Sequence, residues 1–332
     1  MNAAQVRENV LGKTFVEYKV FDNKLVQCFY YIYFYHFWLP VFIKKQGIKR
    51  YLVFGNYLHG LAFCKKAVLI HHPYLFDLSA IFKLKNNLMI KELARYISFR
   101  VLLLLNLNAM LIVQTSSMSI RLKNSILRRF KSKIIPNPFT GSLQARIKSE
   151  TALYPIRSKR LLENQILKIA YITRYYPHKR FDLLLDFIVE FRKKNIPFVM
   201  YVTVDNVQGG GIFFNDYPEI VNWGELPQEE LQTIYEDVDL CVYFSDRETF
   251  GNTILESLKF GVPIFGLDHD YFRDFVSRPN SALISNSTAD MADSICHVVQ
   301  NIKLFNDLCQ ESLEYSLPFK SVKNWVDELS KF

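Results

Sequence analysis

The sequence predicts an α/β protein of two domains, each built on a doubly wound parallel sheet. The chain has 332 residues, half of them hydrophobic, which is enough for two buried cores. Short apolar runs alternate with stretches of helical periodicity, the pattern of repeated strand–helix–strand units. The net charge also changes sign between the two halves, which indicates domains with different partners.

Eight apolar runs are predicted to form the strands. They lie at 51–54, 67–70, 109–113 and 134–135 in the first half, and at 168–172, 198–204, 240–244 and 262–265 in the second. Helical periodicity fits 181–194, 228–237, 253–260 and 289–312. The polar stretch that follows Pro138 is the predicted linker. Ligands of doubly wound sheets bind beyond the carboxyl ends of the strands, so a site is expected in the loops that follow these runs.

The charge distribution bears on the partners. Residues 1–150 carry 23 Lys and Arg against 6 Asp and Glu, a net +17, whereas residues 151–332 carry 18 against 26, a net −8. A basic half suits anionic lipid, a phosphorylated acceptor or nucleic acid, and the simpler interpretation is a solvated basic surface. Nucleic acid is disfavoured as a partner because the basic residues are scattered and no recognised motif frames them.

Cysteine content and the amino end indicate the compartment. The five cysteines are an odd number with no Cys-x-x-Cys pair, which argues against a disulfide framework and a structural zinc site. We therefore expect a reducing, cytosolic interior. The first twenty residues contain Glu8 and Glu17 and lack an apolar core, so no signal peptide is expected.

The aromatic segment 25–43 has three interpretations. Its 19 residues approach the roughly 20 that span a bilayer, but four of them are tyrosines, whose hydroxyls are poorly placed in hydrocarbon. A helix lying on a membrane and a helix buried in the domain are the alternatives to a spanning helix. Pro40 is predicted to bend or end this helix, and four basic residues follow at once, namely Lys44, Lys45, Lys49 and Arg50.

The stretch 239–266 carries the clearest chemistry. A buried strand leads into a polar loop ending at Glu248, and a helix is predicted to begin near Asn252, after Gly251. Glycine permits close approach of a ligand, and the helix amino terminus suits a phosphate. Glu256 follows Glu248 by eight residues, about 12 Å of helical rise. Two acceptors so placed suit the two ends of an elongated ligand such as a sugar nucleotide.

This arrangement resembles the retaining glycosyltransferases of family 4. Their paired Glu residues, with Phe-Gly after the first and Gly-x-Pro after the second, correspond here to Glu248, Phe250, Gly251, Glu256, Gly261 and Pro263. Similar segments surround them: Arg174 and Lys179 after a strand, Trp223-Gly224, the pair His71-His72, 113–116 and 136–138. The resemblance covers about residues 50–330 in order.

The resemblance implies the GT-B fold, in which two Rossmann-like domains with doubly wound parallel sheets face a central cleft. We expect an acceptor-side domain at 1–155, a nucleotide-sugar donor domain at 156–316 and a helix at 317–332 that crosses back to the first domain. The amino end departs from the family pattern, because it offers only Gly12 where members have a Gly-rich loop. That end is therefore predicted to be atypical or truncated.

The resemblance also assigns roles. It implies that Glu248 contacts the donor sugar as a catalytic residue, that Glu256 holds the ribose, and that Arg174 and Lys179 neutralise the diphosphate. One of His71 and His72 would lie near the reacting sugar. The remaining expected donor-binding residues are Trp223, Gly224, Thr249, Phe250, Gly251 and Asn252.

Each assignment has a structural alternative. Glu248 would serve as a helix-capping acid, and Glu256 as a solvated helix residue. Arg174 and Lys179 would be surface cations, and either histidine a satisfied polar group.

The implied function is transfer of a sugar from a UDP- or GDP-sugar to a saccharide or lipid-linked saccharide, without metal or cofactor. Biosynthesis of surface polysaccharide, such as lipopolysaccharide O-antigen or capsule, is the implied setting. We expect a cytoplasmic protein, peripheral on the inner face of the plasma membrane and in contact with anionic lipid, with no nucleic-acid partner. The alternative is a catalytically impaired, nucleotide-sugar-binding partner subunit of another glycosyltransferase.

Two further patterns are interpreted as structural. Asp237 and Asp239 resemble a metal-binding pair of acids, but they precede a strand, which is the wrong end of the strand for a ligand. The run of three glycines at 209–211 lacks the spacing of a dinucleotide or phosphate loop and is predicted to be a flexible loop.

Overall fold

The computed structural model describes residues 4–8, 14–18, 26, 29–30, 33–54, 56, 64–138, 153–163, 166–205, 214, 216–276, 283–316, 322–329 and 331. The chain divides into two compact units. The first unit comprises 1–112, 124–133 and residue 332, and the second comprises 113–123 and 134–331. The predicted domain boundaries at 155 and 316 stay predictions, and the glycine run 209–211 lies outside the described residues.

The first unit is built on a four-stranded sheet in the order β3-β4-β5-β6. Its strands are β3 (Arg50–Val53), β4 (Lys65–Leu69), β5 (Met110–Val113) and β6 (Lys131–Ile134), and the β3–β4 and β4–β5 pairs are parallel. Helices α3 (Leu78–Ile81) and α4 (Asn86–Leu104) follow β4, with short 3-10 turns at Pro73–Phe76 and Ile126–Arg129. Helix α5 (Ser116–Lys123) follows β5 in the chain but belongs to the second unit. The apolar centres of β4 and β5 are fully buried, as a parallel sheet requires.

The amino end forms an antiparallel pair of strands, β1 (Ala4–Glu8) and β2 (Thr14–Tyr18), in a sheet of its own. This pair stands where a Rossmann-like domain begins with a strand, a Gly-rich loop and a helix.

The part of the aromatic segment that is described without a gap is helical from residue 33 to residue 45. A π-helical turn, η1 (Phe34–Trp38), runs directly into α2 (Leu39–Lys45). Pro40 therefore does not end the helix, contrary to one of the two expected outcomes. Proline lacks an N–H and clashes with the carbonyl four residues earlier, and the wider π turn before it relieves that clash. Among the described residues, no helix combines the length and apolarity that a membrane span needs.

The second unit contains a six-stranded sheet in the order β12-β11-β10-β7-β8-β9, and all neighbouring strands are parallel. The strands are β7 (Leu167–Tyr171), β8 (Phe198–Val202), β9 (Ile220–Asn222), β10 (Leu240–Tyr243), β11 (Ile264–Leu267) and β12 (Ile284–Ser285). The order reverses between β7 and β10, so the loops after these two strands diverge from a common point. That switch point is where ligands bind in such sheets.

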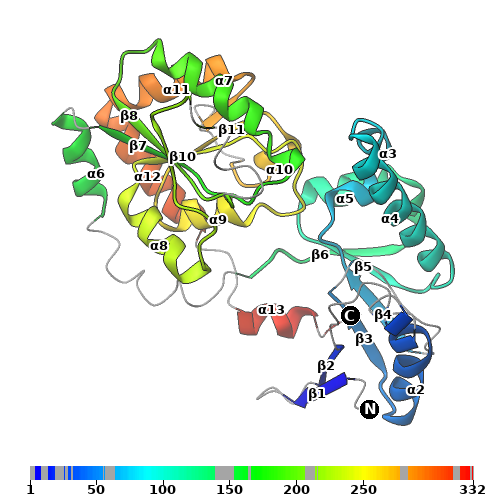
Figure 1. The fold of residues 1–332 in the computed structure, drawn as a ribbon. Coiled ribbons are helices and arrows are strands. Elements are labelled where there is room, and N and C mark those ends of the chain that lie inside the picture. The colour runs from blue at the N-terminus through cyan, green and yellow to red at the C-terminus, as the bar shows by residue number, and fades with distance from the viewer. Residues whose placement is uncertain are drawn as a thin grey trace. The chain divides into compact units, whose positions relative to one another are not determined.

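Helices cover both faces of this sheet (Figure 1). The described helices of residues 134–331 are α6 (Leu153–Leu162), α7 (Phe181–Arg192), α8 (Gln228–Asp237), α9 (Asn252–Lys259), α10 (Asp270–Arg273), α11 (Thr288–Gln300), α12 (Ile302–Ser316) and α13 (Val322–Leu329), of which α13 does not lie on the sheet. Helix α7 packs against α11, and α9 packs against α12. Each buries an apolar stripe, of which Leu184, Phe187, Ile188 and Phe191 on α7 are an example.

The predicted helix 289–312 is two helices. Asn301 lies between them in a non-helical conformation, with φ −115° and ψ 89°. Its side-chain oxygen accepts a hydrogen bond from the Leu304 amide at 3.1 Å, which caps α12. The apolar periodicity continues across this break, which is why the sequence pattern did not reveal it.

Candidate active site

The loops after β7 and β10 are tied together at the switch point of the second unit. The first loop passes through a 3-10 turn, η6 (Pro177–Lys179), and the second runs through Ser245 and Asp246 to Glu248. The Asp246 amide donates to the His178 carbonyl at 2.8 Å, and the Ser245 hydroxyl donates to the same carbonyl at 3.2 Å. These bonds fix the two loops side by side, where the sheet order makes them neighbours.

Glu248 is the centre of the hydrogen-bond network in these loops. Its carboxylate accepts hydrogen bonds from the Lys179 ammonium, from the Tyr243 hydroxyl at 2.9 Å and from the Ser245 hydroxyl at 2.8 Å. Burial of its side chain, which is 14% exposed, opposes ionisation, but the charge of Lys179 and these hydrogen bonds outweigh burial and hold the pKa of Glu248 below its ordinary value. The carboxylate is therefore ionised and fixed at neutral pH.

Buried tyrosines hold the backbone of the two loops in place by hydrogen bonds. The Tyr171 hydroxyl donates to the Lys179 carbonyl, and the Tyr271 hydroxyl donates to the Ser245 carbonyl. Burial raises the pKa of Tyr171, Tyr243 and Tyr271 well above the ordinary value, so all three act as neutral donors. The sequence analysis did not identify these tyrosines, although Tyr171 and Tyr243 are the last residues of their strands.

Two further groups of this loop pair were not predicted. Burial lowers the pKa of His178 to about 4, so its imidazole is neutral at physiological pH. Arg180 adopts a left-handed conformation with φ 49° and pairs with Asp246 at 2.9 Å and with Asp182 at 2.7 Å. The sequence signal for Arg180 is its position directly after Lys179, at the start of α7.

Helix α9 begins at the same edge of the sheet. Its N-cap, Gly251, has φ 87° and ψ 59°, and no side chain there accepts a hydrogen bond from the first amides. Before it, Phe250 is buried with its ring 5.1 Å from that of Phe275, and the carbonyl of buried Thr249 accepts from the Thr115 hydroxyl at 3.4 Å. The helix amino terminus thus presents uncapped N–H groups and partial positive charge at the site.

The first helical residue of α9 is exposed and polar. The Asn252 side-chain oxygen accepts a hydrogen bond from the Asn137 amide group at 3.1 Å.

Glu256 lies on α9, one turn after its start. Only four of the seven residues between Glu248 and Glu256 are helical, so the expected rise of about 12 Å is wrong, and the helical part contributes about 6 Å. The Glu256 carboxylate accepts a hydrogen bond from the buried Tyr235 hydroxyl on α8 at 3.0 Å. Burial nevertheless raises the pKa of Glu256 above its ordinary value.

The other predicted donor residues of the second unit follow β7 and β9. Arg174 is 70% exposed, and its guanidinium Nε lies 3.6 Å from a Glu225 oxygen rather than on Glu248. The Trp223 ring packs edge-on against Tyr201 with centroids 5.6 Å apart. Gly224 has φ 74°, and its amide donates to the Asn222 side chain at 3.0 Å. The structure thus brings Lys179 onto Glu248 and leaves Arg174 turned toward solvent.

The histidine pair belongs to the first unit, directly after β4. His72 Nε2 lies 3.3 Å from Glu92 Oε2 and 3.0 Å from Arg95 Nη1, and Arg95 in turn pairs with Glu92 at 2.7 Å. The His71 amide donates to the Asn56 side chain. Burial raises the pKa of Glu92. His72 is therefore held by an ion-pair network on α4.

The acid pair Asp237 and Asp239 lies at the amino end of β10, away from the switch point. Asp237 pairs with Lys168 at 2.6 Å, and Asp239 pairs with Arg160 at 2.6 Å and accepts the Lys168 amide at 2.9 Å. Both acids thus join β10 to β7 and α6, as the structural interpretation of this pair predicts.

Taken together, the second unit presents a fixed carboxylate, an ammonium group, a second carboxylate and an uncapped helix terminus at one sheet edge. Positive charge and N–H groups suit an anionic group such as a phosphate, and carboxylates suit hydroxyl groups.

The model of the family "Glycosyl transferases group 1" matches residues 167–301, which contain all of these groups. Over 194 residues the chain is 26% identical to the GtfA subunit of a UDP-N-acetylglucosamine–peptide N-acetylglucosaminyltransferase from Streptococcus agalactiae. That match covers 52% of this chain and 37% of the relative.

Two solved structures illustrate the likeness of fold. A mutant of S. aureus TarM, in complex with fondaparinux, α-GlcNAc-glycerol and UDP, is 18% identical with a TM-score of 0.58, over 99% of this chain and 64% of TarM. WaaG, a glycosyltransferase involved in lipopolysaccharide biosynthesis, is 11% identical with a TM-score of 0.62, over 90% of this chain and 80% of WaaG. The chain thus spans less than two thirds of GtfA and TarM. With the two parallel-sheet units, these likenesses confirm the predicted GT-B fold class.

Proposed function

We propose that this chain is a retaining glycosyltransferase of family 4 that transfers a sugar from a UDP- or GDP-sugar to a saccharide acceptor. The observation that carries the proposal is the fixed Glu248–Lys179 pair at the switch point of the second sheet, next to the start of α9. The match of residues 167–301 to the glycosyltransferase family model supports it. UDP is bound to TarM, and a UDP-sugar appears in the name of the GtfA relative, which favours UDP as the nucleotide.

The chemistry requires stabilisation of negative charge. In the transfer, the bond between the anomeric carbon and the phosphate oxygen breaks, and its electron pair stays on the nucleoside diphosphate. The acceptor hydroxyl oxygen forms the new bond on the same face of the sugar, and its proton passes to the leaving diphosphate oxygen. Lys179, Arg174 and the amides at the start of α9 would bind the diphosphate and stabilise this charge without a metal or a further cofactor.

The carboxylates would bind the two ends of the donor. Glu248, ionised and held by three donors, would stabilise the positive charge that develops on the sugar ring and accept hydrogen bonds from its hydroxyls. Glu256 would accept hydrogen bonds from the ribose hydroxyls, with Tyr235 fixing its position. Trp223 and Gly224 would flank the base, and His71 or His72 would contact the reacting sugar.

The acceptor we propose is a lipid-linked saccharide in surface-polysaccharide biosynthesis, which the chain would reach as a cytoplasmic protein at the inner face of the plasma membrane. The strong positive charge of residues 1–150 supports an anionic membrane contact. The likeness to WaaG, involved in lipopolysaccharide biosynthesis, supports the setting.

The test is sugar transfer by Glu248→Gln. Release of UDP or GDP from a panel of sugar nucleotides, with saccharides and bacterial lipid extract as acceptors, identifies the active donor. The variant should lose at least about a hundredfold in turnover, as for removal of one group that stabilises the transition state. Glu163→Gln, at an exposed ion pair on α6, is the matched control and should keep full activity. Full activity in a folded Glu248→Gln protein would refute the proposal.

A second candidate is a nucleotide-sugar-binding partner subunit without activity of its own. Two observations favour this candidate: the antiparallel pair β1–β2 at the amino end, and the name of the GtfA relative, which is a subunit. This candidate predicts that the chain binds UDP but transfers sugar only when a second protein is added.

A further inference from the structure

The helical segment that ends in α2 exposes an unusual apolar face. Five large hydrophobic side chains point to solvent from it, with exposures of 46–73%, namely Val26, Phe29, Tyr33, Phe37 and Val41. The opposite face is buried through Phe34, Leu39 and Ile43. Tyr33, Phe37 and Val41 follow one another at intervals of four, so they share one side of the helix described over residues 33–45 and form an apolar stripe there. This helix is apolar on both faces, but only one face packs into the domain. An exposed apolar face of this kind usually marks a binding surface for an apolar partner.

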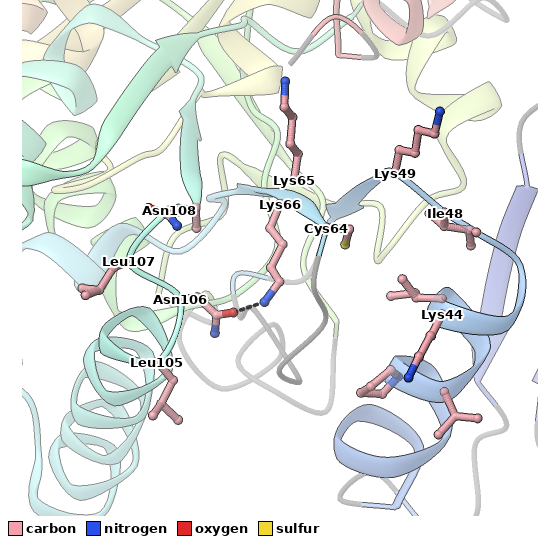
Figure 2. Close-up of a pocket in the computed structure, with 15 residues that line it drawn as sticks. Lys44, Ile48, Lys49, Cys64, Lys65, Lys66, Leu105, Asn106, Leu107 and Asn108 are labelled. Carbon is pink, nitrogen blue, oxygen red and sulfur yellow. Dashed lines mark hydrogen bonds between the residues drawn. The ribbon is translucent and has the colours of Figure 1, made fainter.

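A groove of about 1260 Å³ adjoins this stripe in the first unit. Pro40 and Val41 of α2 line one wall, and Leu105 and Leu107, in the turn after α4, line the other (Figure 2). Leu105 and Leu107 are themselves exposed large hydrophobics, as are Ile97, Val101 and Leu104 on α4. Exposed apolar side chains therefore stand on both sides of the groove.

Lysines supply the polar part of the groove. Figure 2 shows Lys44 entering from α2 and Lys66 entering from β4, where it donates to the Asn106 side chain. Lys49 and Lys65 also line the groove, but Figure 2 shows their side chains pointing away from Lys44 and Lys66. None of the described residues that line the groove is acidic, so Lys44 and Lys66 give it a positive charge.

This groove lies at the opposite end of the strands from the predicted site. Lys65 and Lys66 begin β4, and Ala109 precedes β5, whereas His71 and His72 follow the carboxyl end of β4. The groove is thus separate from the residues to which a role in catalysis is assigned.

We propose that this face of the first unit docks on an anionic phospholipid bilayer, with the apolar stripe at the acyl boundary and Lys44 and Lys66 on headgroup phosphates. The match is chemical: a bilayer surface offers hydrocarbon and phosphate within a few ångströms, and this face offers apolar side chains and ammonium groups. A second copy of the chain would bring lysines against lysines. Nucleic acid would leave Phe29, Phe37 and Val41 in water. The inference gives the membrane contact of the proposed function a defined surface and rests on that function only for its biological purpose.

The experiment is sedimentation of the full chain with vesicles, without donor or acceptor. Vesicles of phosphatidylcholine with 30% phosphatidylglycerol should bind the protein, and pure phosphatidylcholine vesicles should not. Binding should weaken as salt is raised. Phe37→Ser/Val41→Ser and Lys44→Gln/Lys66→Gln should each weaken binding at least tenfold. The matched controls Leu162→Ser and Lys303→Gln, exposed in the second unit, should bind as wild type.

Other outcomes overturn the inference. Equal binding of wild type and both double variants would place the contact elsewhere. Binding of soluble glycerol phosphate in calorimetry, without vesicle binding, would make the groove a small-molecule phosphate site. A dimer that Phe37→Ser/Val41→Ser dissociates, without vesicle binding, would make the face a self-association surface. A parallel titration with UDP separates the two proposals, because loss of vesicle binding with retained UDP binding contradicts only the membrane contact.

Discussion

At the residue scale, the two carboxylates of the site are held under opposite electrostatic conditions. Lys179 and two hydroxyl groups keep the pKa of Glu248 below its ordinary value, despite burial. Glu256 accepts a hydrogen bond from the neutral Tyr235 hydroxyl, and burial raises the pKa of Glu256. A buried carboxylate that is poorly stabilised by hydrogen bonds when no ligand is bound is stabilised when two ribose hydroxyls donate to it. This is consistent with the proposed role of Glu256.

Glu256→Gln should stabilise the protein at alkaline pH. A raised folded-state pKa means that the contribution of Glu256 to stability is fully present below its ordinary value of 4.5 and is lost as pH rises through the folded pKa. Glutamine removes the buried charge and keeps an oxygen for Tyr235. Thermal unfolding should show a melting temperature about 2 °C above wild type at pH 8, with the difference vanishing near pH 4. A variant less stable than wild type at pH 8 would contradict the account of its burial.

Glu248→Gln should show the opposite pH dependence. Because the folded-state pKa of Glu248 is depressed, its contribution to stability is present above its ordinary value of 4.5 and is lost as pH falls through the folded pKa. The variant should therefore unfold below the wild-type temperature at pH 7 and approach it as the buffer is taken toward pH 3. A difference in melting temperature that stays constant from pH 7 to pH 3 would mean that the ion pair of Glu248 with Lys179 does not contribute to stability.

At the element scale, the start of α9 depends on glycine at residue 251. A Cβ there would lie 2.8 Å from Ile254 Cδ1, in addition to the strain of φ 87°. Gly224 has a similar φ of 74° but open space around it, so it is a matched control for strain alone. Gly251→Ala should cost about 1–3 kcal/mol in urea unfolding and weaken UDP binding, and Gly224→Ala should cost less. Equal costs would mean that the contact with Ile254 relaxes freely.

A buried arginine joins α6 to the ends of α8 and α9. The Arg157 side chain is 1% exposed and donates to four carbonyls, those of Tyr235 at 2.8 Å, Val238 at 2.9 Å, and Phe260 and Gly261 at 3.1 Å. These carbonyls lie at the last turns of α8 and α9, where cations are favourable. The sequence analysis placed this residue at the start of the donor domain and assigned it no role.

Arg157→Met should destabilise the second unit strongly. Methionine fills similar volume but leaves four buried carbonyls without their donor, which we expect to cost about 3–5 kcal/mol. The control Arg192→Met removes an arginine whose partner, Glu219, lies on the surface, and should cost less than about 1 kcal/mol. Urea unfolding followed by circular dichroism gives both values. Similar midpoints for the two variants would contradict the role assigned to Arg157.

Long, strongly patterned elements could be predicted from the sequence, and short or context-dependent ones could not. All eight apolar runs correspond to strands in the structure, although β6 and β11 are shifted by two or three residues from the predicted positions. Strands β9 and β12 have three and two residues, too few to show a period. In the site, Glu248 and Lys179 stood out by their motif spacing. Tyr171, Tyr243 and Tyr271 did not, because they come from β7, β10 and the helix after β11, which only the pairing of these three strands in the sheet brings together.

At the scale of the whole molecule, the chain separates two chemistries between two units. The second unit, of net acidic sequence, gathers its candidate donor groups at the carboxyl edge of its sheet, between β7 and β10. The first unit, of net basic sequence, carries an apolar stripe and a lysine-lined groove at the amino edge of its sheet. Relatives of this fold that are named for peptide and lipopolysaccharide differ in acceptor, so the second unit is where a common function is expected.

The central claim is that the second unit binds a nucleoside diphosphate through Glu256 and the start of α9. Calorimetric titration of UDP and GDP into the protein, without metal, tests it most directly. We expect one nucleotide to bind, with Kd at least tenfold weaker in Glu256→Gln and unchanged in Glu163→Gln. Binding of neither nucleotide to the folded wild-type protein, or equal binding by both variants, would contradict the claim.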